Sequence, residues 1–287
     1  MKVTRDAQKI ANNIVIIDGF SRSGKSVVAR LLGYLDRCEQ WQTEYLYEFI
    51  AQIDGIKKIS RDASVSMINM WSDMHLYNLM IGRNVNARKT DLSSPYFDGL
   101  GKKFNERLKK PDGDIVLKEI KSINPILPLH VHHIFGHSDL LIKGFGDRLK
   151  AYIISLRNPC ELADFYISWI DRLCKDSRSF KFCVKNKNGD KFPYYITSNF
   201  QDKYKDCSSI EKSILTVYSF HQKMFKMFDK LDDSLKEKII FIPFENFTSN
   251  PDKFINEICL KLNTDRNHNF YKMMKKENLP RKHVKSE

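Results

Sequence analysis

Residues 13–35 read NIVIIDGFSRSGKSVVARLLGYL, and this stretch decides the fold. The nearly continuous apolar run at 13–18 indicates a buried strand of the kind found in parallel sheets that are covered on both faces. Valines and leucines then recur at helical spacing from Val27 to Leu35. Between these elements, residues 19–26 fit the pattern G-x-x-x-x-G-K-[ST], which marks a phosphate-binding loop when a strand precedes it and a helix follows. The stretch therefore predicts a site for a phosphorylated nucleotide.

Each part of this loop has a physical role in holding an anion. Glycines such as Gly24 let the backbone turn so that successive N–H groups and the helix N-terminus face the ligand. Lys25 places a positive charge where a leaving phosphate develops negative charge. The Ser26 hydroxyl is suited to donate to a phosphate oxygen or to bind Mg²⁺. The loop side chains Ser21, Arg22 and Ser23 complete the predicted binding set.

Outside the loop, strand and helix patterns alternate along the chain. Four more apolar runs are predicted as buried strands, at 114–117, 126–133, 151–156 and 238–244. Asn158-Pro159, with Glu161 three residues after Asn158, predicts a helix start with an N-cap, a proline in the first turn and a capping box. Asn250-Pro251 predicts a second start of the same kind. The alternation favours a single α/β domain over residues 1–287, built on a parallel sheet flanked by helices.

Two stretches do not fit the sheet. Residues 55–110 are predicted as a helical insertion whose own core contains Met67, Met70, Trp71 and Met74. Residues 175–206 carry eight lysines or arginines against four aspartates, and Gly189 and Pro193 interrupt any period. We interpret this second stretch as a mobile basic flap (residues 175–206, called the flap below).

Composition narrows the possible settings. The formal net charge is +13 over 287 residues, which favours anionic partners without identifying one. No apolar run approaches the roughly 18–20 residues that a membrane-spanning helix needs, and the N-terminus lacks a signal-peptide pattern. The six cysteines form no C-x-x-C pair, which favours reduced thiols. The missing membrane span and signal peptide and the reduced thiols predict a cytoplasmic protein. We expect no nucleic-acid partner, although the charge alone would also suit one.

The ends of the predicted strands suggest which nucleotide the loop holds. An ATP–Mg²⁺ enzyme of this type needs an acidic residue at the end of a second apolar strand. Instead, the 151–156 run leads into Arg157 and the 126–133 run ends on His132 and His133. Arg157 lies beside a helix N-terminus, so it is a second candidate group for binding an anion. Two separate anion sites suit a nucleotide with phosphates at both ends of its ribose.

Four segments resemble the sulfotransferases, which transfer a sulfuryl group from 3′-phosphoadenosine 5′-phosphosulfate (PAPS). The loop resembles that family's 5′-phosphosulfate loop, usually written G-x-P-[RK]-[SG]-G-T. Residues 151–169 resemble its 3′-phosphate strand and helix, which would assign Arg157 to the 3′-phosphate. Residues 241–262 (FIPFENFTSNPDKFINEICLKL) are similar to its late strand and helix. Arg281 and Lys282 are similar to the basic C-terminal loop that closes over the 3′-phosphate. The resemblance implies a P-loop NTPase-like fold, PAPS as cosubstrate, no metal, and a hydroxyl-bearing acceptor such as a carbohydrate or an anionic glycan.

The departures from this pattern keep two alternatives open. Lys25 stands where the family usually has threonine, so the loop also satisfies the pattern of an ATP–Mg²⁺-dependent kinase of a small molecule or nucleotide. The family's serine, eight residues after Arg157, is replaced by Phe165, and Ser168 lies one turn later. A non-catalytic binder of nucleotides or polyanions is the third interpretation.

Sulfuryl transfer needs a base that removes the acceptor proton, and two residues are candidates. Glu44 lies where some carbohydrate and tyrosyl-protein sulfotransferases place a catalytic glutamate, and we favour it narrowly. His132 lies at the end of a central strand, where cytosolic small-molecule sulfotransferases place a histidine. The nearby histidines 130, 133 and 137 have no cysteine or carboxylate at ligand spacing, so a zinc site is not expected.

Overall fold

The computed structural model describes residues 1–287 except 112, 174, 178, 180 and 283–287. A parallel sheet of five strands forms its centre, in the order β2-β3-β1-β4-β7. Its strands are β1 (Asn13–Gly19), β2 (Gln42–Thr43), β3 (Ile126–His130), β4 (Leu149–Leu156) and β7 (Ile239–Pro243). In the register, Ile16 of β1 lies between Leu129 of β3 and Tyr152 of β4. The predicted α/β class, with a parallel sheet flanked by helices, is confirmed.

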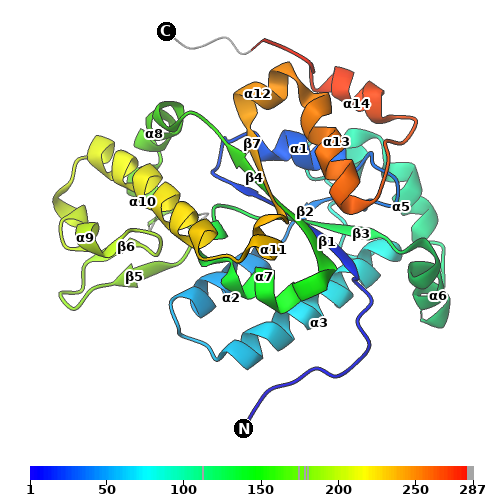
Figure 1. The fold of residues 1–287 in the computed structure, drawn as a ribbon, viewed down its shortest axis with the longest axis horizontal. Coiled ribbons are helices and arrows are strands. Elements are labelled where there is room, and N and C mark those ends of the chain that lie inside the picture. Colours follow the sequence, from blue (N-terminus) through cyan, green and yellow to red (C-terminus); the bar gives the residue numbers. More distant parts are fainter. Residues whose placement is uncertain (112, 174, 178, 180, 283–287) are drawn as a thin grey trace.

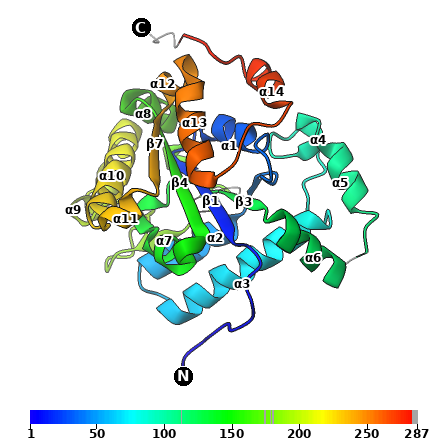
Figure 2. The same ribbon diagram turned by 45° about the vertical axis from the view of Figure 1, so that its right-hand side comes forward.

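Helices cover both faces of the sheet (Figure 1), and Figure 2 shows the two layers from a second direction. One layer contains α1 (Lys25–Leu32), α12 (Phe244–Ser249), α13 (Pro251–Leu262) and α14 (Phe270–Lys276). The other contains α2 (Tyr45–Gly55), α3 (Arg61–Met80), α7 (Asp139–Phe145), α8 (Pro159–Ile167) and α10 (Ser209–Asp229). Successive side chains of β1 point to opposite faces of the sheet, so this strand contributes to the core under both layers of helices. Ile14 and Ile16 pack into the core beneath α2 and α3, whereas Val15 and Ile17 pack into the core beneath α1 and α13.

Short elements connect these layers. They are α4 (Pro95–Asp98), α5 (Gly101–Arg107), α6 (Asp114–Ile123), α9 (Ser198–Gln201), α11 (Asp233–Lys236), β5 (Cys183–Lys185), β6 (Lys191–Pro193), and the 3₁₀ turns η1 (Phe135–His137), η2 (Gly146–Arg148), η3 (Ile170–Arg172) and η4 (Tyr204–Asp206). Asn158 caps α8 as predicted, because its side-chain oxygen accepts from the Cys160 N–H at 2.9 Å. The predicted capping box is wrong, since the N–H of Asn158 donates to Glu245 at 3.1 Å. Proline also opens α13, where the Asn250 side chain makes no capping hydrogen bond.

The strand predicted at 114–117 is wrong, because these residues begin the helix α6. Its buried residues are Val116 and Ile120, which lie four apart on one helical face, while Ile115 and Leu117 are exposed. Gly113 precedes the helix with φ 83°, and Asn124 ends it in the left-handed conformation. A run of four apolar residues is too short for its period to separate strand from helix.

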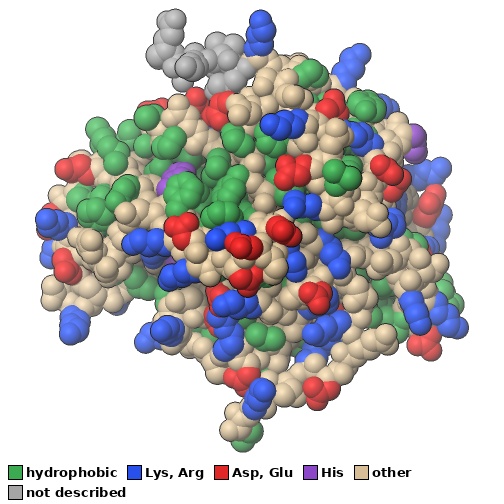
Figure 3. All heavy atoms as spheres, in the orientation of Figure 1, with side chains coloured by type: hydrophobic (Ala, Val, Ile, Leu, Met, Phe, Trp, Pro, Cys, Tyr) green, Lys and Arg blue, Asp and Glu red, His purple; other side chains and the backbone are tan. Residues whose placement is uncertain are grey.

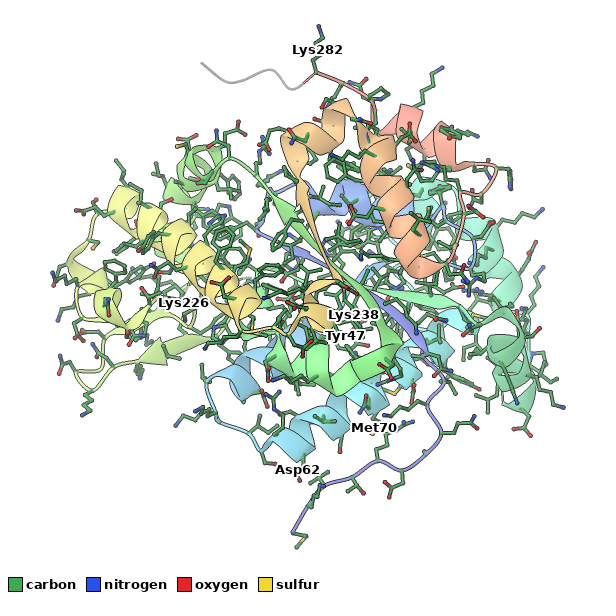
Figure 4. The ribbon with its side chains drawn as sticks, in the orientation of Figure 1. Tyr47, Asp62, Met70, Lys226, Lys238 and Lys282 are labelled. Atoms are coloured by element: carbon green, nitrogen blue, oxygen red, sulfur yellow. The ribbon has the colours of Figure 1, made fainter. Side chains whose placement is uncertain are left out.

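The insertion at 55–110 is helical as predicted, but its core differs. Met70 and Met74 are 53% and 41% exposed, so their prediction as core residues is wrong. Met70 lies on the outer side of α3 (Figure 4). Met67 and Trp71 are partly buried, whereas the core that this stretch shares with the sheet contains the buried residues Ile68, Leu76, Leu79, Met80 and Phe104. The insertion therefore shares the sheet's core instead of forming one of its own.

The flap contains more regular structure than its composition suggests. Its strands β5 and β6 pair antiparallel, and Gly189 provides the positive φ of 84° in the turn between them. A small apolar cluster of Phe192, Tyr194, Tyr195, Ile196 and Tyr204 supports the hairpin. Cys183 in β5 is disulfide-bonded, so the expectation of six reduced cysteines is wrong at this residue. Cys38, Cys160, Cys207 and Cys259 are free thiols, and Cys174 lies outside the described residues.

The surface over α8 and α10 is rich in apolar side chains (Figure 3). On α10, Ile210, Ile214 and Tyr218 recur every four residues and are 45–56% exposed. They form one exposed stripe, because residues four apart lie on the same helical face.

Candidate active site

The loop between β1 and α1 has the backbone geometry of an anion site. Arg22 and Gly24 both have positive φ, 70° and 86°. A Cβ on Gly24 would lie 2.1 Å from the Phe244 ring, and a Cβ on Gly19 would lie 2.5 Å from the Ser155 carbonyl oxygen. The chain therefore needs glycine at both positions. Gly24 is the N-cap residue of α1 and has no side chain to cap the first turn, which leaves N–H groups of the helix N-terminus for a ligand.

Ser23 is the buried residue at the centre of this loop. Its carbonyl oxygen accepts a hydrogen bond from the Ser155 hydroxyl at 2.6 Å, which anchors the loop to β4. Its own Oγ is buried without a hydrogen-bond partner in the described part of the chain. An unpaired buried hydroxyl is costly, so this donor fits a role in binding a ligand oxygen.

Lys25 is 4% exposed and lies above the loop's own backbone. Its Nζ donates to the Phe20 carbonyl oxygen at 3.1 Å, and this is its hydrogen bond among the described residues. Burial lowers the pKa of Lys25 to about 8, while the negative charge of Asp18 acts in the opposite direction. A buried ammonium with donors to spare is suited to neutralise an anion bound in the loop.

Asp18, the buried residue before the loop, has a structural role. Its carboxylate accepts hydrogen bonds from the Gly19 N–H at 2.6 Å, the Ile134 N–H at 3.1 Å and the Tyr152 hydroxyl at 2.9 Å. Burial raises its pKa. These bonds tie the end of β1 to the segment after β3 and to β4, so they hold the loop and the histidines in a fixed relation.

The segment after β3 brings His132 against a buried glutamate. His132 Nδ1 lies 2.6 Å from Glu48 Oε1, and Glu48 Oε2 pairs with Lys181 Nζ at 3.3 Å. Glu48 is fully buried in α2, and burial raises its pKa. Burial, with the positive charges of Lys25 and Lys181, lowers the pKa of His132 well below its usual value. His132 is therefore neutral, and Nε2 keeps a lone pair when the Nδ1 proton is donated to Glu48.

The other histidines near the loop have different surroundings. His130 Nε2 lies 3.4 Å from the Ser26 hydroxyl, and its Nδ1 lies 3.4 Å from the Thr43 hydroxyl. His133 stacks on Phe20 at 5.2 Å between ring centroids. Burial lowers the pKa of both histidines. Among the described residues, no group of three or more histidines, cysteines or carboxylates is arranged to hold a metal ion.

Two predicted arginines meet at one aromatic ring. The guanidinium carbons of Arg157 and Arg281 lie 5.7 and 6.0 Å from the centroid of Phe244, the ring that contacts Gly24. Arg157 also donates to the Arg22 carbonyl oxygen at 2.9 Å, and Glu161 accepts from it at 2.7 Å. The fold thus brings positive charge from β4 and from the chain end to the side of the loop.

Two predicted site residues, Lys282 and Glu44, lie outside this arrangement, as does Ser168. Lys282 is exposed, and its side chain extends away from the molecule (Figure 4). Ser168 donates to the Phe165 carbonyl oxygen of its own helix at 3.1 Å, so its hydroxyl is occupied there. Glu44 is the half-buried N-cap residue of α2, and burial raises its pKa. It is one turn away from Glu48, which holds His132.

A cavity of about 150 Å³ leads to His132. The described residues that line it come from the loop, the first turn of α2, the turn after β3, α8 with the segment that follows it, and the flap. They are Ser21, Tyr45, His132, His133, Phe165, Tyr166, Trp169, Leu173, Ser179 and Lys181. Sequence reasoning missed Glu48, Asp18 and Lys181. The first lies four residues after Glu44 on the same helical face, which is a usable signal, whereas Lys181 reaches the site only through the tertiary fold.

The chain has distant similarity to several solved structures. The chain is similar to the sulfotransferase domain from the curacin biosynthetic pathway, with a TM-score of 0.47 and 13% identity over 91% of this chain and 77% of that one. It is also similar to the sulfotransferase domain of the Synechococcus PCC 7002 olefin synthase, with a TM-score of 0.39 and 13% identity over 94% of this chain and 79% of that one. A third similar structure is sulfotransferase STF9 from Mycobacterium avium, with a TM-score of 0.44 and 10% identity over 95% of this chain and 68% of that one. No protein-family model matches the sequence, and no curated protein matches it. At TM-scores below 0.5 these likenesses assign no activity, so the function has to follow from the site. No helix in the described ranges is both long and apolar enough to cross a membrane.

Proposed function

We propose that the chain transfers a sulfuryl group from PAPS to an acceptor hydroxyl. One observation carries the proposal: an anion-binding loop with a buried Lys25 lies beside His132, whose Nδ1 is held by Glu48 at 2.6 Å. Both groups follow neighbouring parallel strands, β1 and β3, so they lie at the carboxyl edge of the sheet, where α/β proteins bind their ligands. A cation for the leaving group and a neutral base for the acceptor are what sulfuryl transfer requires.

Each residue then has a role in the reaction. His132 Nε2 accepts the proton of the acceptor hydroxyl as its oxygen bonds to sulfur, and Glu48 stabilises the imidazolium that forms. Lys25 neutralises the charge that develops on the bridging phosphate oxygen when its bond to sulfur breaks. The Ser23 hydroxyl and the N–H groups of the α1 N-terminus bind the phosphate oxygens. Adenosine 3′,5′-bisphosphate (PAP) then leaves with that charge.

The residues beside the loop fit a donor with a second phosphate. Arg157 and Arg281 converge on Phe244, so two guanidinium groups are available next to the loop for a 3′-phosphate. This arrangement supports their assignment to that phosphate, although the serine of the sequence pattern is replaced by Phe165. Phe165 instead lies under the Arg22 guanidinium, 5.0 Å from its ring centroid.

The buried carboxylates favour this donor over ATP–Mg²⁺. Asp18 accepts three hydrogen bonds from the protein, and Glu48 pairs with His132 and Lys181. A magnesium ion held by either carboxylate would have to displace these partners. The hydroxyl acceptor follows from the base. Whether that hydroxyl belongs to a carbohydrate, as the sequence predicted, depends on the cavity that leads to His132.

Calorimetric titration with PAP and with ATP–Mg²⁺ tests the donor. We expect PAP to bind more tightly, and we expect sulfuryl transfer to continue in EDTA. A clear preference for ATP–Mg²⁺, or a strict need for Mg²⁺, would support the kinase interpretation instead. Tight binding of PAP without turnover of any acceptor would support a non-catalytic binder.

A matched pair of variants tests the base. Glu48→Gln keeps the size of the side chain but removes the charge that stabilises the His132 imidazolium. We expect Glu48→Gln and His132→Ala to lower kcat by about 10²–10⁴-fold, the usual range for a general base. Glu44→Gln, one turn away, should leave kcat close to that of the native chain. The opposite ranking would make Glu44 the base, as the sequence favoured.

A further inference from the structure

His130 contacts a hydroxyl group at each of its two ring nitrogens. Nε2 lies 3.4 Å from the Ser26 hydroxyl, and Nδ1 lies 3.4 Å from the Thr43 hydroxyl. The His130 side chain is buried, and in the described part of the chain these two hydroxyls are its hydrogen-bond partners. The three side chains therefore form a line of polar contacts that begins at β2 and ends at the phosphate-binding loop.

The sheet fixes the direction of this line. His130 is in register with Ile17 of β1 and with Thr43 of β2. Residues in register on neighbouring strands share a face of the sheet, so the His130 ring lies on the face that α1 covers, where Ile17 is buried. Trp41 packs against the ring, with centroids 4.6 Å apart. Nδ1, the nitrogen nearer the backbone, meets Thr43, whereas Nε2 reaches across to Ser26 in the first turn of α1.

The His130 ring is neutral in these surroundings. Burial is the main cause that lowers its pKa well below the usual value, and the charge of Lys25 acts in the same direction. A neutral imidazole has a single N–H, so it donates through one nitrogen and accepts through the other. The ring can therefore pair with its two hydroxyls in two ways, one for each tautomer.

The two tautomers give Ser26 opposite roles. With the proton on Nε2, the ring donates to Ser26 Oγ and accepts the Thr43 proton at Nδ1, which leaves the Ser26 proton for a ligand in the loop. With the proton on Nδ1, Nε2 accepts the Ser26 proton, and Oγ presents lone pairs to the loop. A phosphate oxygen needs a donor, whereas Mg²⁺ needs an oxygen lone pair. The first tautomer suits a phosphate, and the second suits a metal ion.

We propose that His130 is a positioning residue, which makes the Ser26 hydroxyl a donor to the 5′-phosphate of PAPS. His130 acts through Ser26 and not on the reacting atoms. A bound phosphate selects the Nε2–H tautomer, because its negative oxygens attract the Ser26 proton and repel lone pairs. This inference rests on the proposed sulfuryl transfer and goes beyond it, since it gives Ser26, His130 and Thr43 a joint role in binding the donor.

A double-mutant cycle tests whether His130 acts through Ser26. Calorimetry measures the affinity for PAP of the full native chain, of Ser26→Ala, of His130→Leu and of the double variant. We expect Ser26→Ala to weaken PAP binding about tenfold or more, as for a lost hydrogen bond to a charged group. His130→Leu should weaken it about threefold or more in the native chain but less than about twofold in Ser26→Ala. Equal losses in the two backgrounds would overturn the inference.

Two amides separate the role of the N–H donor from that of the ring's bulk. The glutamine side chain can place an N–H near the position of Nε2, whereas asparagine is shorter and reaches the position of Nδ1. We expect His130→Gln to keep the affinity for PAP within about threefold of the native value, and His130→Asn to lose as much as His130→Leu. Equal losses in the two amide variants would contradict a role as a donor to Ser26.

His75 provides a matched control for the loss of a buried histidine. It lies in α3 and is 5% exposed, and the Tyr47 hydroxyl lies 3.4 Å from its Nδ1. His75→Leu should leave the affinity for PAP unchanged, and urea unfolding shows that each variant is folded. A loss of PAP affinity in His75→Leu as large as that in His130→Leu would count against the proposal, because it would trace the loss to the core and not to Ser26.

Heteronuclear NMR of the histidine ring nitrogens reads the tautomer directly. His130→Gln identifies the His130 signals by their disappearance. We expect the Nε2–H tautomer in the PAP complex, and the Nδ1–H tautomer there would overturn the inference even if PAP binds well. Failure of the native chain to bind PAP would instead overturn the proposed function. Normal PAP binding without coupling between His130 and Ser26 would overturn this inference alone.

Discussion

Replacing Gly24 by alanine tests whether the loop geometry is as tight as it appears. Gly24 has φ 86° and ψ 1°, in the left-handed region, and a Cβ there would lie 2.1 Å from the ring of Phe244. The left-handed conformation costs a non-glycine residue about 1–2 kcal/mol. Overpacking against the ring adds about 1–3 kcal/mol. We therefore expect Gly24→Ala to lower the free energy of unfolding by about 2–5 kcal/mol, the sum of these two costs.

Gly99 provides a matched control within the same chain. Its φ of 85° and ψ of 8° are nearly those of Gly24, but a Cβ there would meet no atom within 4 Å. Gly99→Ala should therefore cost only the conformational part, about 1–2 kcal/mol. Urea unfolding measures both variants, and calorimetry measures their affinity for PAP. We expect Gly24→Ala alone to lose PAP binding, because the ring and the new methyl group cannot share the loop.

A double-mutant cycle separates the two costs further. Phe244→Ala removes the ring, so adding Gly24→Ala in that background should cost about 1–2 kcal/mol, the value for Gly99. Equal losses for Gly24→Ala and Gly99→Ala would refute the clash. So would normal PAP binding by Gly24→Ala.

Three further predictions concern the donor site. Lys25 is protonated below its pKa of about 8 and neutral above it, so PAP affinity should fall by at most tenfold per pH unit as the pH rises through that value; in Lys25→Arg, whose guanidinium stays charged, this dependence should vanish. Ser23→Ala removes a buried hydroxyl that lacks a partner, so urea unfolding should show unchanged or higher stability while the affinity for PAP falls about tenfold; a parallel loss of both would mean that the hydroxyl serves the fold. Arg281→Ala should weaken PAP binding about tenfold or more but leave adenosine 5′-phosphate unaffected, whereas Lys282→Ala, at an exposed position, should change neither by more than a small factor.

The loop and the sheet could be predicted because their signals are local. Residues 13–26 contain a strand, a turn with two glycines and a helix start in immediate succession, so neighbours in sequence are also neighbours in space. The strand predicted at 114–117 was wrong for a related reason. A run of four apolar residues fits the period of a strand and that of a helix equally well, and the segment forms a helix that packs against α3. The sequence also predicted Met70 and Met74 as core residues although they are exposed, because the apolar residues of α3 lie on more than one of its faces.

Only part of the candidate site could be predicted from the sequence, because its residues come from segments that lie far apart in the chain. His132 could be found from its place after a strand. Glu48, which holds His132 Nδ1, was not singled out, and the sequence put forward Glu44 as an alternative base instead. Lys181 carries no local signal at all. It is one of many lysines in a basic stretch, and only the packing of the flap against α2 distinguishes it.

The hydrogen bonds of Asp18 fix one part of the candidate site to the central sheet. They join β1, β4 and the segment after β3, so Lys25 and His132 belong to one rigid framework. Lys181 and Ser179, which also line the cavity, lie in the flap, just before the hairpin that has its own apolar cluster. Lys25 and His132 are thus held in place by the sheet, whereas much of the cavity wall comes from α2, from α8 with the segment that follows it, and from the flap. Substitutions in the cavity walls could therefore change the acceptor, while the groups proposed to bind the leaving group and to act as the base stay in place.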